Sequence, residues 1–178
     1  MEFVKLIVTR LESEGISYML TGSMAMAVYS MPRMTRDVDL VVECGPEDAG
    51  RIVKLFATDC YVDAQSVREA VARQHMFNMI HQKWIIKADF IIRKDEVYRK
   101  LEFERRRRVD LEDVSISVVA PEDLILSKLC WARDSQSELQ ESDARRLIES
   151  VVDLDWPYLE RWAESLGIRD LLDRVRTG

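Results

Sequence analysis

The feature that most constrains this chain is a pair of aspartates at the head of an apolar run. Asp37 and Asp39 open DVDLVVE, residues 37–43, a short apolar run typical of a buried β-strand. Side chains two positions apart on a strand project from the same face, with Cα atoms roughly 6.6 Å apart at ~3.3 Å per residue. Two carboxylates on one half-buried face repel each other and lose hydration. The fold must therefore bring positive charge to this pair.

Length and charge limit the class of protein that carries the pair. With 178 residues, 47% of them hydrophobic and 33% charged, the chain can form a globular domain with a sizeable core. A formal net charge of −6 argues against generic nucleic-acid binding, which needs an excess of basic surface.

Several negative signs indicate a cytoplasmic protein with no membrane partner. The first apolar run is too short for a signal peptide, and no stretch approaches the ~20 apolar residues of a membrane span. The three cysteines are far apart and form no CxxC pair, which fits reduced thiols in a cytosolic protein.

The periodicity of apolar residues predicts an α/β (α+β) fold. Strands are predicted over 16–21, 37–43, 76–82, 84–92 and 114–119. Helices are predicted over 2–14, 23–30, 46–57, 66–74 and 95–106, and over 121–134, 138–152, 157–166 and 168–176. We therefore expect an α/β core of residues 1–119 and a helical carboxy-terminal subdomain, residues 120–178, packed against it.

A third acid, Asp89, lies inside the apolar segment IIKADFII. A lone strand aspartate is more often an edge acid or a hydrogen-bonded structural one, but three acids on two short strands favour a metal site. Clustered carboxylates are the hard oxygen ligands that Mg²⁺ prefers, usually together with substrate phosphates. Two such ions can stabilise both the attacking and the leaving oxygens in phosphoryl chemistry. The three acids thus predict Mg²⁺ (or Mn²⁺) as cofactor.

Gly22 and Ser23 lie between a predicted strand and a predicted helix. The free N–H groups at a helix start, with the helix dipole, form an anion site suited to a triphosphate. Glycine allows close backbone approach, and serine can cap the helix or hydrogen-bond a phosphate oxygen. Most Gly-Ser pairs before a helix are only caps, but this pair followed after thirteen residues by Asp-x-Asp is far more specific.

These motifs resemble the polymerase-β-like nucleotidyltransferase superfamily, and in particular its small bacterial AbiEii/MenT-type members. The resemblance spans roughly residues 17–150 and is carried by GSMAMAVYSMPRMTRDVDLVV, KADFII and PEDLILSKLCWARD…ESDARRLI. It implies a mixed nucleotidyltransferase-type sheet flanked by helices and an NTP substrate chelated by Mg²⁺. It also implies that Asp37 and Asp39 hold the nucleotide-bound metal, whereas Asp89 completes a second metal site and helps activate the acceptor hydroxyl. The metal pair would then supply the missing positive charge.

Further basic and acidic residues are candidate nucleotide contacts. Lys128 lies inside an apolar arc of its predicted helix, and the resemblance favours a phosphate contact over a lysine that snorkels to solvent. Asp143 also matches the family pattern, at the edge of its own apolar arc. Arg33 and Arg36 could reach phosphates or could be solvated loop residues. The run 105–108, four arginines, is interpreted as a solvated face, with an RNA acceptor as the alternative.

The leading hypothesis is an Mg²⁺-dependent nucleotidyltransferase that moves NMP from an NTP to an acceptor hydroxyl and releases pyrophosphate. One alternative is a metal-dependent nuclease or phosphodiesterase, which the triphosphate-type Gly-Ser turn disfavours. Another is a non-catalytic binding module of a toxin–antitoxin complex, which the presence of all three acids disfavours. The acceptor (a tRNA end, a protein side chain or a small molecule) and a toxin role with a cognate antitoxin stay open.

Overall fold

The structure, a computed structural model, describes residues 1–31, 34–35 and 37–177. Its strands are β1 (Ser17–Thr21), β2 (Asp37–Glu43), β3 (Cys60–Val62), β4 (Met76–His81), β5 (Ile86–Ile92), β6 (Arg107–Leu111) and β7 (Val114–Val118). Its helices are α1 (Glu2–Ser13), α2 (Gly22–Tyr29), α3 (Ala49–Phe56), α4 (Ala64–Arg73), α5 (Val97–Glu104), α6 (Pro121–Ser135), α7 (Glu138–Ser150), α8 (Trp156–Ser165) and α9 (Arg169–Thr177).

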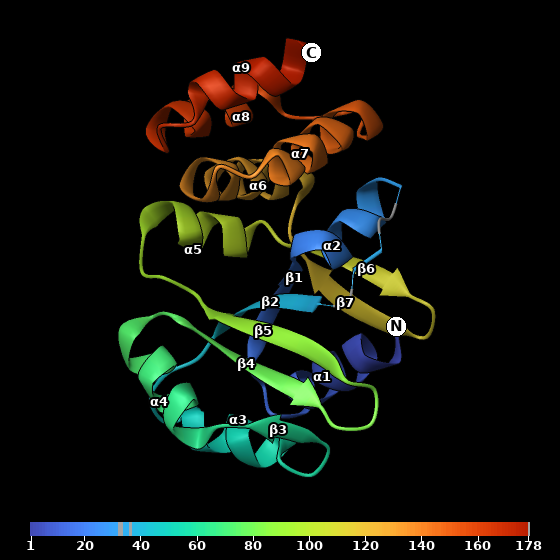
Figure 1. The fold of residues 1–178 in the computed structure, drawn as a ribbon, viewed down its shortest axis with the longest axis vertical. Coiled ribbons are helices and arrows are strands. Elements are labelled where there is room, and N and C mark those ends of the chain that lie inside the picture. Colours follow the sequence, from blue (N-terminus) through green and yellow to red (C-terminus); the bar gives the residue numbers. More distant parts are fainter. Residues whose placement is uncertain (32–33, 36, 178) are drawn as a thin grey trace.

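The strands form one mixed sheet in the order β3-β4-β5-β2-β1-β7-β6. The pairs β2/β5 and β1/β7 are parallel, and the other neighbours are antiparallel. Parallel neighbours need a crossover between them, which α3, β3, α4 and β4 provide between β2 and β5. This arrangement, shown in Figure 1, confirms the predicted α/β class with a mixed sheet.

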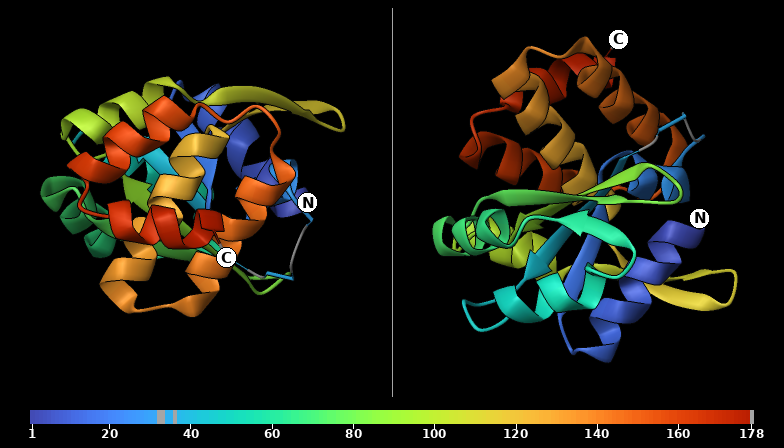
Figure 2. Two further views of the ribbon diagram at one scale, coloured as in Figure 1. Left: turned by 90° about the horizontal axis from the view of Figure 1, so that it is seen from above. Right: turned by 60° about the horizontal axis from the view of Figure 1, so that its bottom comes forward.

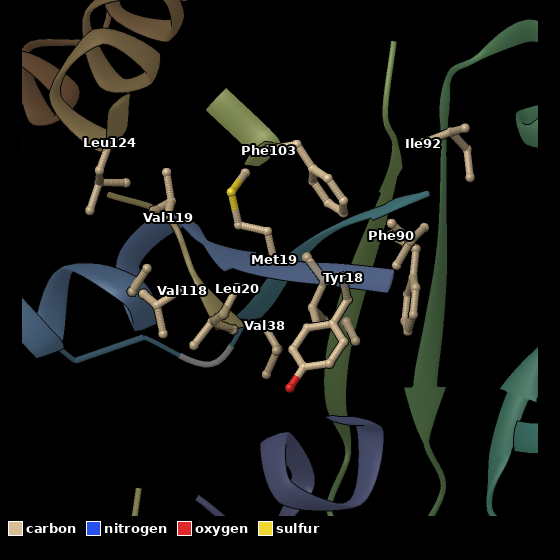
Figure 3. Close-up of a cluster of buried hydrophobic side chains, with 14 of the residues drawn as sticks. Tyr18, Met19, Leu20, Val38, Phe90, Ile92, Phe103, Val118, Val119 and Leu124 are labelled. Atoms are coloured by element: carbon tan, nitrogen blue, oxygen red, sulfur yellow. The ribbon is translucent and has the colours of Figure 1, made fainter. Parts of the chain in front are cut away.

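The two faces of the sheet are covered to different extents. On one face, Phe77 of β4 stacks on Phe90 of β5, and Phe90 contacts Phe56 of α3. On the other face, helices α5 and α6 cover the middle of the sheet, and Figure 3 shows side chains of both in one buried cluster with residues of β1 and β7. Along β4 the second face is exposed, since its residues alternate between exposed and buried. A solvent-facing strip of sheet therefore lies beside the covered part.

The carboxy-terminal helices α6–α9 lie together at one end of the molecule (Figures 1 and 2). Helix α6 contacts α2, α7, α8 and α9, so it lies between the sheet and the last helices. None of the helices in the described part of the chain is long and apolar enough to cross a membrane.

A buried ion network fixes α6 against its neighbours. Its acids, Glu102 of α5 with Glu122 and Asp123 of α6, are each no more than 3% exposed, and we call them the helix cluster. Arg105 donates to Asp123 at 2.9 Å and to Glu122 at 3.1 Å. The other carboxylate oxygens accept from Arg99 and Ser127 (to Glu102), the Asp155 backbone N–H (to Glu122), and Tyr98 and Tyr158 (to Asp123). The helix that carries Lys128 is thereby held in place.

The arginine run is a solvated face only at Arg107 and Arg108, which are exposed; the interpretation is wrong for Arg105 and Arg106, which are partly buried. Arg105 belongs to the ion network, and Arg106 lies over the Phe103 ring. Arg107 and Arg108 begin β6, an edge strand that the sequence analysis missed, and Arg108 pairs with Glu12. Charged side chains are common on edge strands, where they hinder pairing with other chains.

Candidate active site

The strand register brings the predicted acids to one place on the sheet. In the parallel pair β2/β5, Asp39 lies opposite Asp89 and Asp37 lies opposite Lys87. Neighbouring strands are about 4.8 Å apart, so these side chains share one small area of the sheet face. In the antiparallel pair β1/β2, Asp39 lies opposite Thr21, the last residue before α2. We call Asp37, Asp39 and Asp89 the strand-end cluster.

Gly22 brings the start of α2 against the Asp39 carboxylate. Its φ of +64° lies in the left-handed region, and a Cβ built on Gly22 would lie 2.0 Å from Asp39 Oδ2. No residue with a side chain fits here unless the carboxylate moves, so both backbone conformation and space require glycine. Ser23 follows at the start of the helix and is buried. The backbone at the helix start and an acid of the strand-end cluster are therefore in direct contact.

Asp39 is held where its charged form is disfavoured. Burial raises the pKa of Asp39 above its ordinary value, and the charges of Asp89 and Asp37 raise it further. Lys128 and Lys87 act in the opposite direction on the same pKa. The net effect is a raised pKa, with burial as its largest cause.

Asp89 is 8% exposed, and its two carboxylate oxygens differ in their surroundings. Its Oδ2 accepts a hydrogen bond from Lys87 Nζ at 2.7 Å, and this contact raises the pKa of Lys87. Its Oδ1 is buried without a hydrogen-bond partner in the described part of the chain. Buried polar atoms without a partner are rare, and an absent ion is one recognised cause.

Lys87 was not among the predicted site residues, although the sequence carries a signal for it. Lys87 and Asp89 are two positions apart on a strand, so they project from the same face. The cluster therefore has a lysine beside it in addition to any metal.

Lys128 and Asp143 form a buried pair above the cluster. Lys128 is 4% exposed and its Nζ lies 2.7 Å from Oδ2 of Asp143, which is fully buried. The alternative of a lysine that snorkels to solvent is therefore wrong. Because the charge of Lys128 lowers the pKa of Asp39, the pair lies within electrostatic reach of the strand-end cluster. A phosphate contact by either residue stays a prediction.

The strand-end cluster offers oxygen ligands that fit a divalent cation. Within the described part of the chain Asp89 Oδ1 has no hydrogen-bond partner, and the charges of Asp89 and Asp37 add to the effect of burial in raising the pKa of Asp39. The described residues contain no ready-made group of three or more His, Cys, Asp or Glu side chains that could hold a metal. Asp37 is exposed, and Lys87 already contacts Asp89. Arg33 and Arg36, the predicted phosphate contacts, lie outside the described residues.

The fold is similar to solved structures of nucleotidyltransferase-like proteins. An antigenic nucleotidyltransferase-like protein from Paracoccidioides brasiliensis aligns over 98% of this chain and 90% of its own, with 17% identity and a TM-score of 0.58. The lincosamide antibiotic adenylyltransferase LnuA, bound to lincomycin, aligns over 83% of this chain and 96% of its own, with 12% identity and a TM-score of 0.55. ANT(2")-Ia in complex with adenylyl-2"-tobramycin aligns over 99% of this chain and 96% of its own, with 12% identity and a TM-score of 0.56.

At these identities the similarity shows the fold and leaves the activity to be argued from the site. The sequence matches no protein-family model, and a search of curated proteins found no match.

Proposed function

We propose that this chain is a Mg²⁺- or Mn²⁺-dependent nucleotidyltransferase that transfers NMP from an NTP to an acceptor hydroxyl. The observation that carries the proposal is the strand-end cluster itself. Asp39 and Asp89 lie side by side, Asp39 touches Gly22 at the start of α2, and Asp89 keeps a buried oxygen without a hydrogen-bond partner among the described residues. An anion site at a helix start and adjacent carboxylates for its metal are the two parts that triphosphate chemistry needs. The similarity of this fold to the folds of adenylyltransferases supports the same proposal.

The reaction assigns a role to each acid. Asp37 and Asp39 would hold the cation that accompanies the triphosphate, and Asp89 would hold a second one beside the acceptor. Bound divalent cations neutralise charge on the phosphates and lower the pKa of a coordinated hydroxyl. The acceptor oxygen attacks the α-phosphorus, and the bond from that phosphorus to the bridging oxygen breaks. Pyrophosphate leaves, and Asp89 would help activate the acceptor hydroxyl by taking its proton.

The triphosphate would lie at the start of α2. Gly22 and Ser23 provide backbone N–H groups and a hydroxyl, and Lys128, paired with Asp143, adds positive charge from α6. Arg33 and Arg36 would add further contacts.

The acceptor would approach Asp89 across the exposed strip of β4. Asn78 lies opposite Asp89 in the β4/β5 pair, and Ile80 lies opposite Tyr61 of β3. These three side chains are exposed and uncharged. An RNA acceptor needs a basic surface for its phosphates. Apart from Lys87, which lies opposite Ile80, the described residues of this strip carry no positive charge, and this favours a small-molecule acceptor over tRNA.

The resemblance in sequence favours the AbiEii/MenT type within the superfamily. A toxin role would then require a cognate antitoxin as partner. A direct test is to express the chain alone and with its neighbouring genes, and to compare growth.

The central activity is tested with each of the four α-³²P-labelled NTPs, Mg²⁺ and a cell extract. We expect label on one hydroxyl-bearing acceptor, equimolar pyrophosphate, and no transfer by the Asp37→Asn, Asp39→Asn double variant. Label released as free NMP would indicate a hydrolase or phosphodiesterase. NTP binding without transfer would indicate a non-catalytic binding module.

A further inference from the structure

Lys87 holds an unusual position for a lysine in a candidate metal site. Its Nζ lies 2.7 Å from Oδ2 of Asp89, and its strand position is opposite Asp37. The side chain of Lys87 is 39% exposed, whereas that of Asp89 is 11% exposed. The lysine therefore reaches from solvent over a mostly buried acid.

The second lysine near the cluster is engaged elsewhere. Lys128 donates to Asp143 at 2.7 Å, and the pair is almost completely buried. Lys87 is thus the cation that contacts the strand-end cluster directly within the described part of the chain. Its one ammonium stands against three carboxylates, and Asp89 Oδ1 is left without a partner.

Lys87 and a divalent cation compete for the same carboxylate. The ammonium occupies Asp89 Oδ2, and a metal on Asp89 would place a second positive charge within a few ångströms of it. Like charges at such distances repel strongly in a partly buried site. The exposed, flexible lysine stem can move its charge into water, whereas Asp89 is fixed within a sheet strand.

We propose that Lys87 is a displaceable internal cation that holds Asp89 in the metal-free protein and withdraws when a divalent cation binds. The inference rests on the proposed metal site and adds a binding order to it. Free metal must displace Lys87 by itself, so it binds weakly. A metal that arrives with a triphosphate gains the phosphate contacts at the start of α2 as well. The protein therefore takes up the metal–NTP complex rather than the free ion.

The test is to titrate the protein with Mn²⁺ alone and with Mn²⁺ plus NTP. The electron paramagnetic resonance signal of free Mn²⁺ measures binding in each titration. Lys87→Gln should bind free Mn²⁺ roughly fivefold or more tightly than the parent, a coupling of ordinary size between two sites. Without metal, Lys87→Gln should also have a lower Tm than the parent, because the buried Asp89 carboxylate loses its counter-charge. Two controls should behave as the parent: Lys87→Arg, which keeps the charge, and Lys83→Gln, which changes an exposed lysine of the β4/β5 turn.

The outcomes separate this inference from the function on which it rests. If the parent binds Mn²⁺ with NTP but Lys87→Gln binds free Mn²⁺ no more tightly, the displacement proposal is wrong and the metal site stands. If neither protein binds Mn²⁺ with any NTP, the metal site fails and the displacement proposal fails with it. Equal tightening in Lys83→Gln would show a general charge effect and would also overturn the role of Lys87.

Discussion

The helix cluster buries three acidic side chains and the strand-end cluster buries one, Asp89, and the two clusters differ in how the negative charge is met. In the helix cluster, all six carboxylate oxygens of Glu102, Glu122 and Asp123 accept at least one hydrogen bond. In the strand-end cluster, Asp89 has one lysine contact and one buried oxygen without a partner. Burial raises the pKa of Asp39 there, as it raises those of Glu102 and Asp123 in the helix cluster.

The difference separates two uses of a buried acid. A cluster that the chain satisfies by itself fixes helices in place, and removing one member leaves charge and donors without partners. A cluster that the chain leaves incomplete costs stability until something else completes it. The strand-end cluster lies beside a helix start with exposed sheet next to it, where a metal–nucleotide complex can enter.

The largest expected effect comes from breaking the complete cluster. Asp123→Ala removes the acceptor for Arg105, Tyr98 and Tyr158, so the free energy of unfolding should fall by about 3 kcal/mol or more. Urea denaturation followed by circular dichroism measures it. Asp134→Ala, which breaks an exposed pair with Arg133, is the control and should change stability by less than about 0.5 kcal/mol. A similar, small change in both variants would show that the helix cluster is not structural.

Breaking the incomplete cluster should affect chemistry instead of folding. Asp89→Asn should lower nucleotide transfer about 10²-fold or more, the usual cost of removing one preorganised electrostatic group. It should keep most of the NTP-induced rise in Tm, because Asp37 and Asp39 hold the nucleotide-bound metal in this scheme. Circular dichroism first establishes that the variant is folded. Transfer at the parental rate by a folded Asp89→Asn protein would make this acid structural.

The smallest effect is a gain in stability that depends on pH. Since the pKa of Asp39 is raised in the folded protein, its ionisation disfavours folding at pH values above that pKa. Asp39→Asn should therefore raise the metal-free unfolding free energy by roughly 0.5–1 kcal/mol at neutral pH, the ordinary size of a single substitution.

The gain should disappear as the pH falls through the folded pKa of Asp39 towards its ordinary value of 3.8, where the parent also carries a proton. Denaturant titrations of both proteins across this range measure the difference. Asp37→Asn, which changes an exposed acid of the same cluster, should give a smaller gain. A gain for Asp39→Asn that is the same at every pH would contradict the electrostatic cause.

The sequence revealed the strand-end cluster because its members follow local patterns. Asp37 and Asp39 start an apolar run, and Asp89 interrupts another, so strand alternation alone places each acid on its strand. The α/β class followed from the same periodicity, whereas the mixed sheet was expected from the family resemblance. The parallel pairing that places Asp39 opposite Asp89 depends on the crossover, which no local pattern reports.

The structural features that could not be predicted from the sequence depend on contacts between distant residues or on very short strands. Strand β3 has three residues, and β6 begins with charged residues, so neither has a clear apolar alternation. The partners of the helix cluster come from α5, α6 and α8 and from loop residues beside them, and the run of arginines was no guide to which arginine is internal. Lys128 and Asp143 fall on separate helices, so their pairing could not be read from either helix alone.

The central claim is that the incomplete strand-end cluster is completed by a metal–nucleotide complex, and thermal melting tests it most directly. At Mg²⁺ and NTP concentrations of about 100 times Kd, ligand binding stabilises a protein by about 2.7 kcal/mol, which corresponds to a rise in Tm of about 5 °C or more for a chain of this size. We predict such a rise with at least one NTP for the parent, and none for the Asp37→Asn, Asp39→Asn double variant. A parent whose Tm is unchanged by Mg²⁺ or Mn²⁺ with any of the four NTPs at millimolar concentrations would contradict the claim.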